Sequence, residues 1–169
     1  MAWRSALGNV CFALEGTRMR SSERHDRAMR ALERVGLAQH ADHLPWQLSG
    51  GQQQRLQIAR ALAYEPHVML MDEPFGSLDA QTRTDLEDQL LKIWEESQSS
   101  SKSILIVTHD IDESIYLSHR VIVLSKPPTR VIEDIVIDLP WPRDQIVTKA
   151  HPNFNIYRKT IYRLLGHEG

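Results

Sequence analysis

Cysteine is nearly absent from this sequence of 169 residues, and its apolar runs are short. Cys11 is the single cysteine, which excludes an internal disulfide framework and fits a reducing compartment. The main apolar runs lie at 68–71, 104–107 and 121–124. Each is the size of a strand, far below the roughly 20 residues that a membrane-spanning helix needs. The sequence therefore favours neither a small secreted scaffold nor an integral membrane protein.

An excess of positive charge is also missing. Lys and Arg number 20 against 22 Asp and Glu, so the formal net charge of −2 gives no overall field for holding nucleic acid. A secretory leader is not expected, because Asn9 and Glu15 interrupt the apolar stretch at the N-terminus and no clear cleavage site follows. The length suits one domain with a single core, and we expect a cytoplasmic protein.

The spacing of apolar residues predicts alternating helices and strands. Helices are expected at 21–35, 49–63, 80–98 and 110–118, with a final helix striped by Phe154, Tyr157, Ile161, Leu164 and Leu165. The first has Ala28, Leu32 and Val35 on one face, the third is capped by Asp79, and the second buries Leu56, Ala59, Leu62 and Ala63. Strands are expected at 68–71 and 104–108, each buried on both faces, and at 120–124 and 131–137 around a turn at 126–128, with a polar loop at 98–103. Such alternation is typical of an α/β fold with a parallel sheet.

Polar side chains follow the two predicted buried strands at the point where each strand ends. Asp72 and Glu73 follow the first strand, and His109 follows the second. Ligands of parallel α/β sheets gather at the carboxyl ends of strands, so these residues indicate a site. The alternative is that such residues only begin a loop or cap a helix. For Asp110, with Glu113 three residues later, helix capping is the preferred interpretation, and a lone histidine is weak evidence.

The segment 48–52 carries a different signal. Ser49, Gly50, Gly51 and Gln52 open a predicted helix, where backbone N–H groups lack helical partners and are not shielded by side chains. A helix start of this kind attracts phosphate through hydrogen bonds and the helix dipole. An ordinary glycine-rich helix cap is the alternative.

Together these elements resemble the ABC-transporter ATPase family. The signature motif matches 48–55, Walker B with its following glutamate matches 68–73, the D-loop matches 77–80, and the switch-histidine loop matches 108–109. Residues 3–15 resemble the segment after the family's Q-loop, so the likeness covers essentially the whole chain. The resemblance implies a partial P-loop NTPase (RecA-like) core plus the α-helical signature subdomain. The implied division is 1–63 for that subdomain, 64–139 for the core and 140–169 for a C-terminal linker and helix.

The resemblance also implies a role for each motif residue. Asp72 would hold Mg²⁺ through water, Glu73 would orient or deprotonate the attacking water, and His109 would contact the γ-phosphate. Ser49, Gly50, Gly51 and Gln52 would reach ATP held by the opposite subunit of a dimer. Asp79 would lie at the dimer seam.

The family's phosphate-binding loop has no counterpart in this sequence. No glycine is followed directly by lysine, so the pattern G-x-x-x-x-G-K-[ST] does not occur. The Q-loop glutamine and the aromatic residue that stacks on adenine are missing as well. We therefore expect this chain alone neither to bind ATP tightly nor to hydrolyse it. The absence of the strand that leads into this loop would leave strand edges unpaired and apolar faces uncovered. The chain would then be a truncated product, the result of a mis-set start, or half of a split ATPase.

Several stretches resemble one branch of the family, the importers of nitrate, sulfonates, taurine and bicarbonate. They are 71–83, 107–114 and 140–143. The implied partners are a second ATPase subunit, membrane permease subunits and, indirectly, a solute-binding protein, with the chain on the inner face of the cell membrane. One alternative is a catalytically silent module that donates its signature motif to a partner's ATP. Another is a DNA-repair or chromosome ATPase, which the absence of sustained heptads disfavours.

Overall fold

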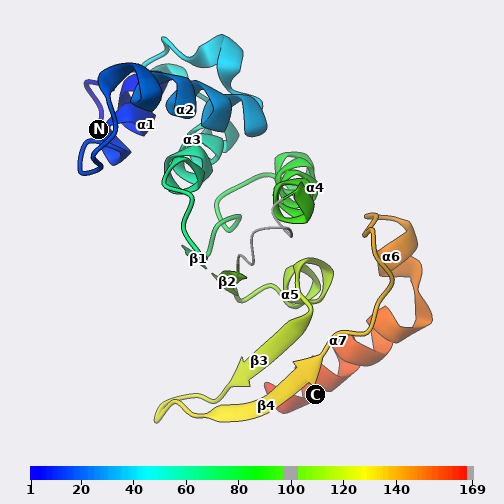
Figure 1. Ribbon diagram of the computed structural model, residues 1–169. Coiled ribbons are helices and arrows are strands. Elements are labelled where there is room, and N and C mark those ends of the chain that lie inside the picture. The colour runs from blue at the N-terminus through cyan, green and yellow to red at the C-terminus, as the bar shows by residue number, and fades with distance from the viewer. Residues whose placement is uncertain (97–102, 167–169) are drawn as a thin grey trace. The chain divides into compact units, whose positions relative to one another are not determined.

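The structure is a computed structural model that describes residues 1–96 and 103–166 (Figure 1). The chain forms two compact units, Met1–Leu105 and Ile106–Gly169. The predicted polar loop at 98–103 lies outside the described residues except for Ser103.

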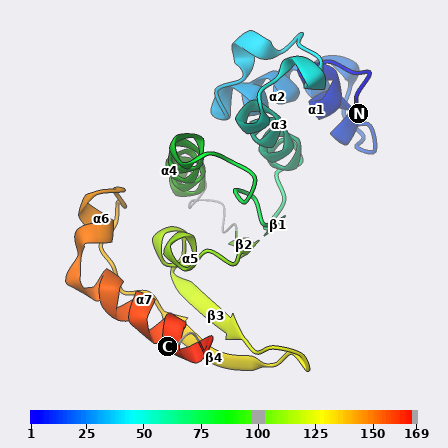
Figure 2. The same cartoon turned by 180° about the vertical axis from the view of Figure 1, so that it is seen from behind.

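The first unit begins with a helical part whose core comes from three packed helices (Figures 1 and 2). They are α1 (Ala6–Ala13), α2 (Ser21–Arg34) and α3 (Gly50–Ala63), with the short 3₁₀ helices η1 (Ala38–His40) and η2 (Pro45–Gln47) between α2 and α3. Ala28, Leu32 and Val35 are buried, as the periodicity predicts. Gly36 ends α2 with a φ of 69°, a conformation that glycine adopts without steric cost.

The rest of the first unit contains β1 (Val68–Asp72), α4 (Ala80–Glu96) and the start of β2 (Ser103–Val107). β1 and β2 are neighbours in a sheet, and the Ser103 amide donates to the His67 carbonyl at 2.9 Å, so both strands start side by side. The expectation that β1 is buried on both faces is wrong. Met69 is 7% exposed, whereas Leu70 is 72% exposed.

The reason for this difference is that one face of the strand pair is covered and the other is open. Met69 and Ile104 line a small cavity with Ile93 and Trp94 of α4, so that face packs against the helix. Leu105 of β2 is 55% exposed and alternates with Ile104, so it faces the other way. The predicted burial of β2 on both faces is therefore wrong too.

The second unit joins a helix to an antiparallel hairpin and two further helices (Figures 1 and 2). It contains α5 (Ile111–Leu117), β3 (Arg120–Leu124), β4 (Val131–Val136), α6 (Val147–Ala150) and α7 (Pro152–Leu164). β3 pairs with β4 from Arg120↔Val136 to Leu124↔Val131, so these two predicted strands form a hairpin and do not extend a parallel sheet. Phe154 and Ile161 of the predicted stripe are buried. Within the described residues, no helix has both the length and the hydropathy needed to span a bilayer.

Candidate functional site

The start of α3 is held by a reciprocal pair of hydrogen bonds. The Gln52 amide donates to Ser49 Oγ at 3.2 Å, and the Ser49 amide donates to Gln52 Oε1 at 2.9 Å. This is a capping box, with glutamine in the position that often holds glutamate. Ser49 and Gly50 are exposed, so the positive end of the helix dipole faces outward with little side chain around it. The arrangement suits contact with an anion supplied from outside the unit.

Gly51 is buried, and its lack of a side chain is required by packing. A Cβ atom at this position would lie 2.3 Å from Cγ2 of Thr82 in the first turn of α4. The amide of Thr82 donates to Asp79 Oδ1 at 3.0 Å, which confirms Asp79 as the cap of α4. Hydrogen bonds from Thr82 lower the pKa of Asp79 below its usual value. Thr82 thus connects the signature motif to Asp79, a link that the motif pattern did not reveal.

This contact predicts different effects of alanine at the two glycines. Gly51→Ala should lower the free energy of unfolding by about 1–3 kcal/mol, because the β-branched Thr82 has little freedom to withdraw. Gly50→Ala meets nothing within 4 Å and should be neutral or stabilising by up to about 1 kcal/mol. Urea denaturation of the chain measures both. The variant Gly51→Ala/Thr82→Ser should recover part of the loss. Equal effects of the two alanines would contradict this account of the packing.

Asp72 and Glu73 lie where β1 ends, and both are exposed. Glu73 has a φ of 47°, a left-handed conformation that non-glycine residues adopt at a cost of about 1–3 kcal/mol. The Gly76 amide donates to the Glu73 carbonyl at 3.3 Å, and Phe75 between them is fully buried. A Cβ atom on Gly76 would lie 3.3 Å from Glu73 Oε2, so the carboxylate folds back over this glycine. The tight turn orients Glu73, and sequence reasoning did not identify Gly76 as its support.

His109 lies in the second unit, exposed, between two residues with defined hydrogen bonds. The Asp110 amide donates to Thr108 Oγ1 at 3.0 Å, and the Glu113 amide donates to Asp110 Oδ1 at 3.1 Å. The predicted role of Asp110 as the cap of α5 is confirmed. Asp72 and Glu73 belong to the first unit and His109 belongs to the second, so their predicted gathering at one edge of the sheet stays a prediction.

The exposed carboxylate of Asp72 fits a magnesium ion that arrives with a nucleotide. Among the described residues, no cluster of three or more His, Cys, Asp or Glu side chains could hold a metal by itself. Mg²⁺ in phosphate-transfer sites commonly takes one or two carboxylates and completes its shell with water and substrate oxygens. One exposed carboxylate at a strand end is sufficient for that mode, and it would not support a metal site made of protein ligands alone.

Known proteins resemble this chain in both sequence and fold. Residues 5–76 match the family described as "ABC transporter". The solved structure "Dimeric Structure of MJ0796, a Bacterial ABC Transporter Cassette" matches with a TM-score of 0.66 and 36% identity, covering 81% of this chain and 58% of that one. The chain therefore has the fold of part of an ABC ATPase cassette. Its residues 5–76 are similar to an ABC transporter ATP-binding domain.

Individual relatives are similar to this chain over most of its length. The "Uncharacterized ABC transporter ATP-binding protein MJ0412" of Methanocaldococcus jannaschii is 47% identical over 168 residues, which is 99% of this chain and 60% of that protein. The "Taurine import ATP-binding protein TauB" of Yersinia pestis is 44% identical over 138 residues, which is 82% of this chain and 53% of TauB. The chain thus spans between half and two thirds of the length of these curated relatives.

Proposed function

We propose that this chain supplies the signature, Walker B, D-loop and switch-histidine elements of an ABC ATPase that couples ATP hydrolysis to import of a small anion. Nitrate, sulfonates and taurine are the candidate solutes. The observation that carries the proposal is the exposed, capped start of α3 at Ser49 and Gly50, whose outward-facing end suits a phosphate group. The four motifs in family order and the cassette fold support it.

In this proposal the start of α3 acts on a nucleotide held by a second ATPase subunit. Ser49, Gly50 and Gly51 contribute hydrogen-bond donors toward the γ-phosphate. Gln52 acts indirectly by supporting these residues. Its Oε1 accepts a hydrogen bond from the Ser49 amide, and its Nε2 lies 3.1 Å from His40 Nε2. Asp79, joined to the same region through Thr82, lies at the seam between the subunits.

The chain's own nucleotide would be served by the residues that follow β1 and β2. Mg²⁺, when bound, supplies positive charge to the phosphate oxygens. Asp72 would hold the ion, Glu73 would accept a proton from the attacking water, and His109 would contact the γ-phosphate. The fixed turn at 73–76 orients the Glu73 carboxylate before the nucleotide binds, which removes part of the ordering cost from the reaction.

The solute class rests on likeness to importers. TauB of Yersinia pestis is named for taurine import, and the stretches 71–83, 107–114 and 140–143 resemble importers of nitrate, sulfonates and bicarbonate. The partners are then a second ATPase subunit, transmembrane permease subunits and, indirectly, a solute-binding protein. The chain would lie at the cytoplasmic face of the membrane. Selectivity would reside in the partner subunits, so no residue of this chain contacts the solute.

The test is reconstitution with a phosphate-binding loop. ATP hydrolysis is measured for the purified chain alone and for the chain mixed with an N-terminal fragment of an ABC ATPase that bears such a loop. We expect no hydrolysis by the chain alone and Mg²⁺-dependent hydrolysis by the mixture, abolished by Ser49→Arg. No hydrolysis by a stably formed complex would contradict the proposal. Stimulation of an intact partner that survives Glu73→Gln would contradict it too and favour the silent module.

A further inference from the structure

We propose that Arg158 of α7 is a positioning residue for the loop that carries His109, and that it acts through Asp112 in the first turn of α5. The inference rests on the proposed function, because it assigns His109 a role at the nucleotide. The proposal assigns α7 a supporting role in that reaction, although α7 lies far along the sequence from the four motifs.

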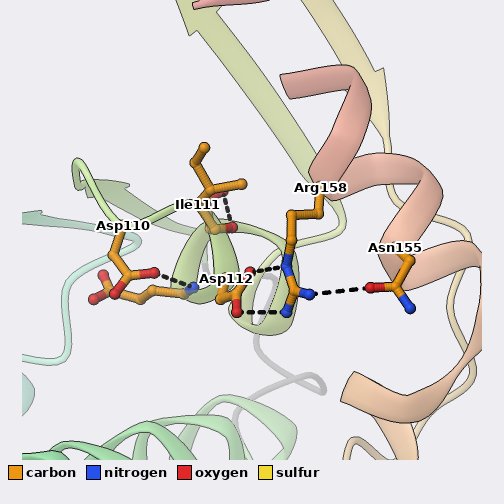
Figure 3. Close-up of polar contacts among 7 residues, drawn as sticks. Asp110, Ile111, Asp112, Asn155 and Arg158 are labelled. Carbon is orange, nitrogen blue, oxygen red and sulfur yellow. Dashed lines mark hydrogen bonds and ion pairs between the residues drawn. The ribbon is translucent and has the colours of Figure 1, made fainter. Parts of the chain in front are cut away.

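Two guanidinium nitrogens of Arg158 donate hydrogen bonds to the carboxylate of Asp112 (Figure 3). Its Nε donates to Asp112 Oδ1 at 2.5 Å, and its Nη2 donates to Asp112 Oδ2 at 2.6 Å. The remaining terminal nitrogen, Nη1, donates to Asn155 Oδ1 at 3.0 Å, and the guanidinium lies 5.2 Å from the ring centre of the buried Phe154. The side chain is therefore oriented on its own helix before it reaches α5, which favours the paired geometry of arginine and carboxylate.

The ion pair between Arg158 and Asp112 is connected to the segment around His109 through a short series of hydrogen bonds. Asp112 and Glu113 belong to the same first turn, and the Glu113 amide is held by the cap Asp110. Asp110 is in turn joined to Thr108, and His109 lies between these two residues. Asp110 and Asp112 both contribute to a raised pKa of Arg158, with the hydrogen bond to Asp112 as the larger cause. The cation thus pairs with Asp112, and the charge of Asp110 favours it only as a smaller contribution.

The short length of α5 makes such an anchor necessary. A helix of seven residues is too short to be stable by its own hydrogen bonds, so its position depends on what it packs against. The contact between α5 and α7 supplies that support within the second unit. The side chains of Arg158 and Asp112 remain 34% and 39% exposed, so the pair should add little to global stability. Its effect should be local, on the order and direction of the His109 loop.

The first experiment follows the loop directly by nuclear magnetic resonance of the whole chain. Arg158→Ala should speed hydrogen exchange at the Glu113 amide about fivefold and shift the imidazole signals of His109. Arg158→Lys should restore part of the protection, because lysine keeps the charge without the paired donors. Lys159→Ala, an exposed neighbour on α7, is the matched control and should change neither signal. If Arg158→Ala behaves like Lys159→Ala, the proposal is overturned.

A double-mutant cycle separates this link from a general weakening of α7. Asp112→Asn should produce the same change at the Glu113 amide, and combining it with Arg158→Ala should add little further. These readouts need no hydrolysis, so they stand even if the reconstitution fails. Where the reconstituted cassette is active, Arg158→Ala should lower kcat and leave KM for ATP within about twofold. Faster exchange at Glu113 with an unchanged kcat would overturn the positioning role.

Discussion

Replacing Glu73 with glutamine should lower the rate of ATP hydrolysis by the reconstituted cassette about 10²–10⁴-fold. Glutamine matches glutamate in size but cannot accept a proton from the attacking water. The turn should survive the change, because the left-handed backbone at 73, the buried Phe75 and the close approach to Gly76 do not depend on the charge. Single-turnover hydrolysis at saturating ATP and Mg²⁺ measures the effect.

The control for this experiment is Glu95→Gln, an exposed glutamate in the last turn of α4. It removes the same charge from the same unit and should leave the rate unchanged. Nucleotide binding should persist in Glu73→Gln, since the proposed role concerns the water and leaves binding to other groups. If Glu73→Gln keeps more than about a tenth of the normal rate, Glu73 does not take part in the catalytic step.

Replacing Arg143 with methionine should destabilise the second unit by about 2–4 kcal/mol. Arg143 is 8% exposed and donates to the last carbonyls of α5, those of Ile115 at 2.8 Å and Tyr116 at 3.2 Å, and to that of Ser118 at 3.0 Å. Helix C-terminal carbonyls lack helical donors, and a cation there is favoured by the helix dipole. The guanidinium also stacks on Trp141, with 4.4 Å between its central carbon and the ring centre.

Methionine fills similar space without donors, so it leaves these carbonyls unsatisfied. Part of that loss is offset, because burial of the charge is itself unfavourable and lowers the pKa of Arg143. Urea denaturation followed by circular dichroism measures the change, and the matched control is Arg130→Met in the exposed turn between β3 and β4. Two variants within about 0.5 kcal/mol of each other would show that Arg143 does not hold α5.

Arg143 and Arg158 hold opposite ends of α5. One satisfies the carbonyls at its C-terminal end, and the other pairs with a carboxylate in its first turn. Both come from the segment that follows the hairpin of β3 and β4. Substitutions of Arg143 and Arg158 should therefore have different effects. Loss of the buried Arg143 contacts should destabilise the second unit as a whole, whereas loss of the half-exposed pair of Arg158 should affect the loop that carries His109.

The helices α2, α3, α4, α5 and α7 and two of their caps could be predicted from the sequence, whereas α1 and α6 were not predicted as separate helices. α2 and α3 lie within one residue of the predicted ranges, and the predicted apolar faces are buried, as at Leu32 and Leu56. Asp79 and Asp110 cap the helices for which they were expected. These features depend on residues three or four positions apart, so a linear pattern contains the information. The signature, Walker B, D-loop and switch-histidine motifs could be recognised for the same reason.

The tertiary structure alone decided which faces and side chains those elements bring into contact. Leu70 reads as a core residue in the sequence, yet it is exposed because the packed face of the strand belongs to Met69. Thr82 against Gly51 and Arg158 on Asp112 join residues 31 and 46 positions apart, a separation that no helical or strand period reaches. The sequence by itself determined the local elements and the motif chemistry. Packing decided the supports around them, because burial and long-range pairing depend on where the chain returns in space.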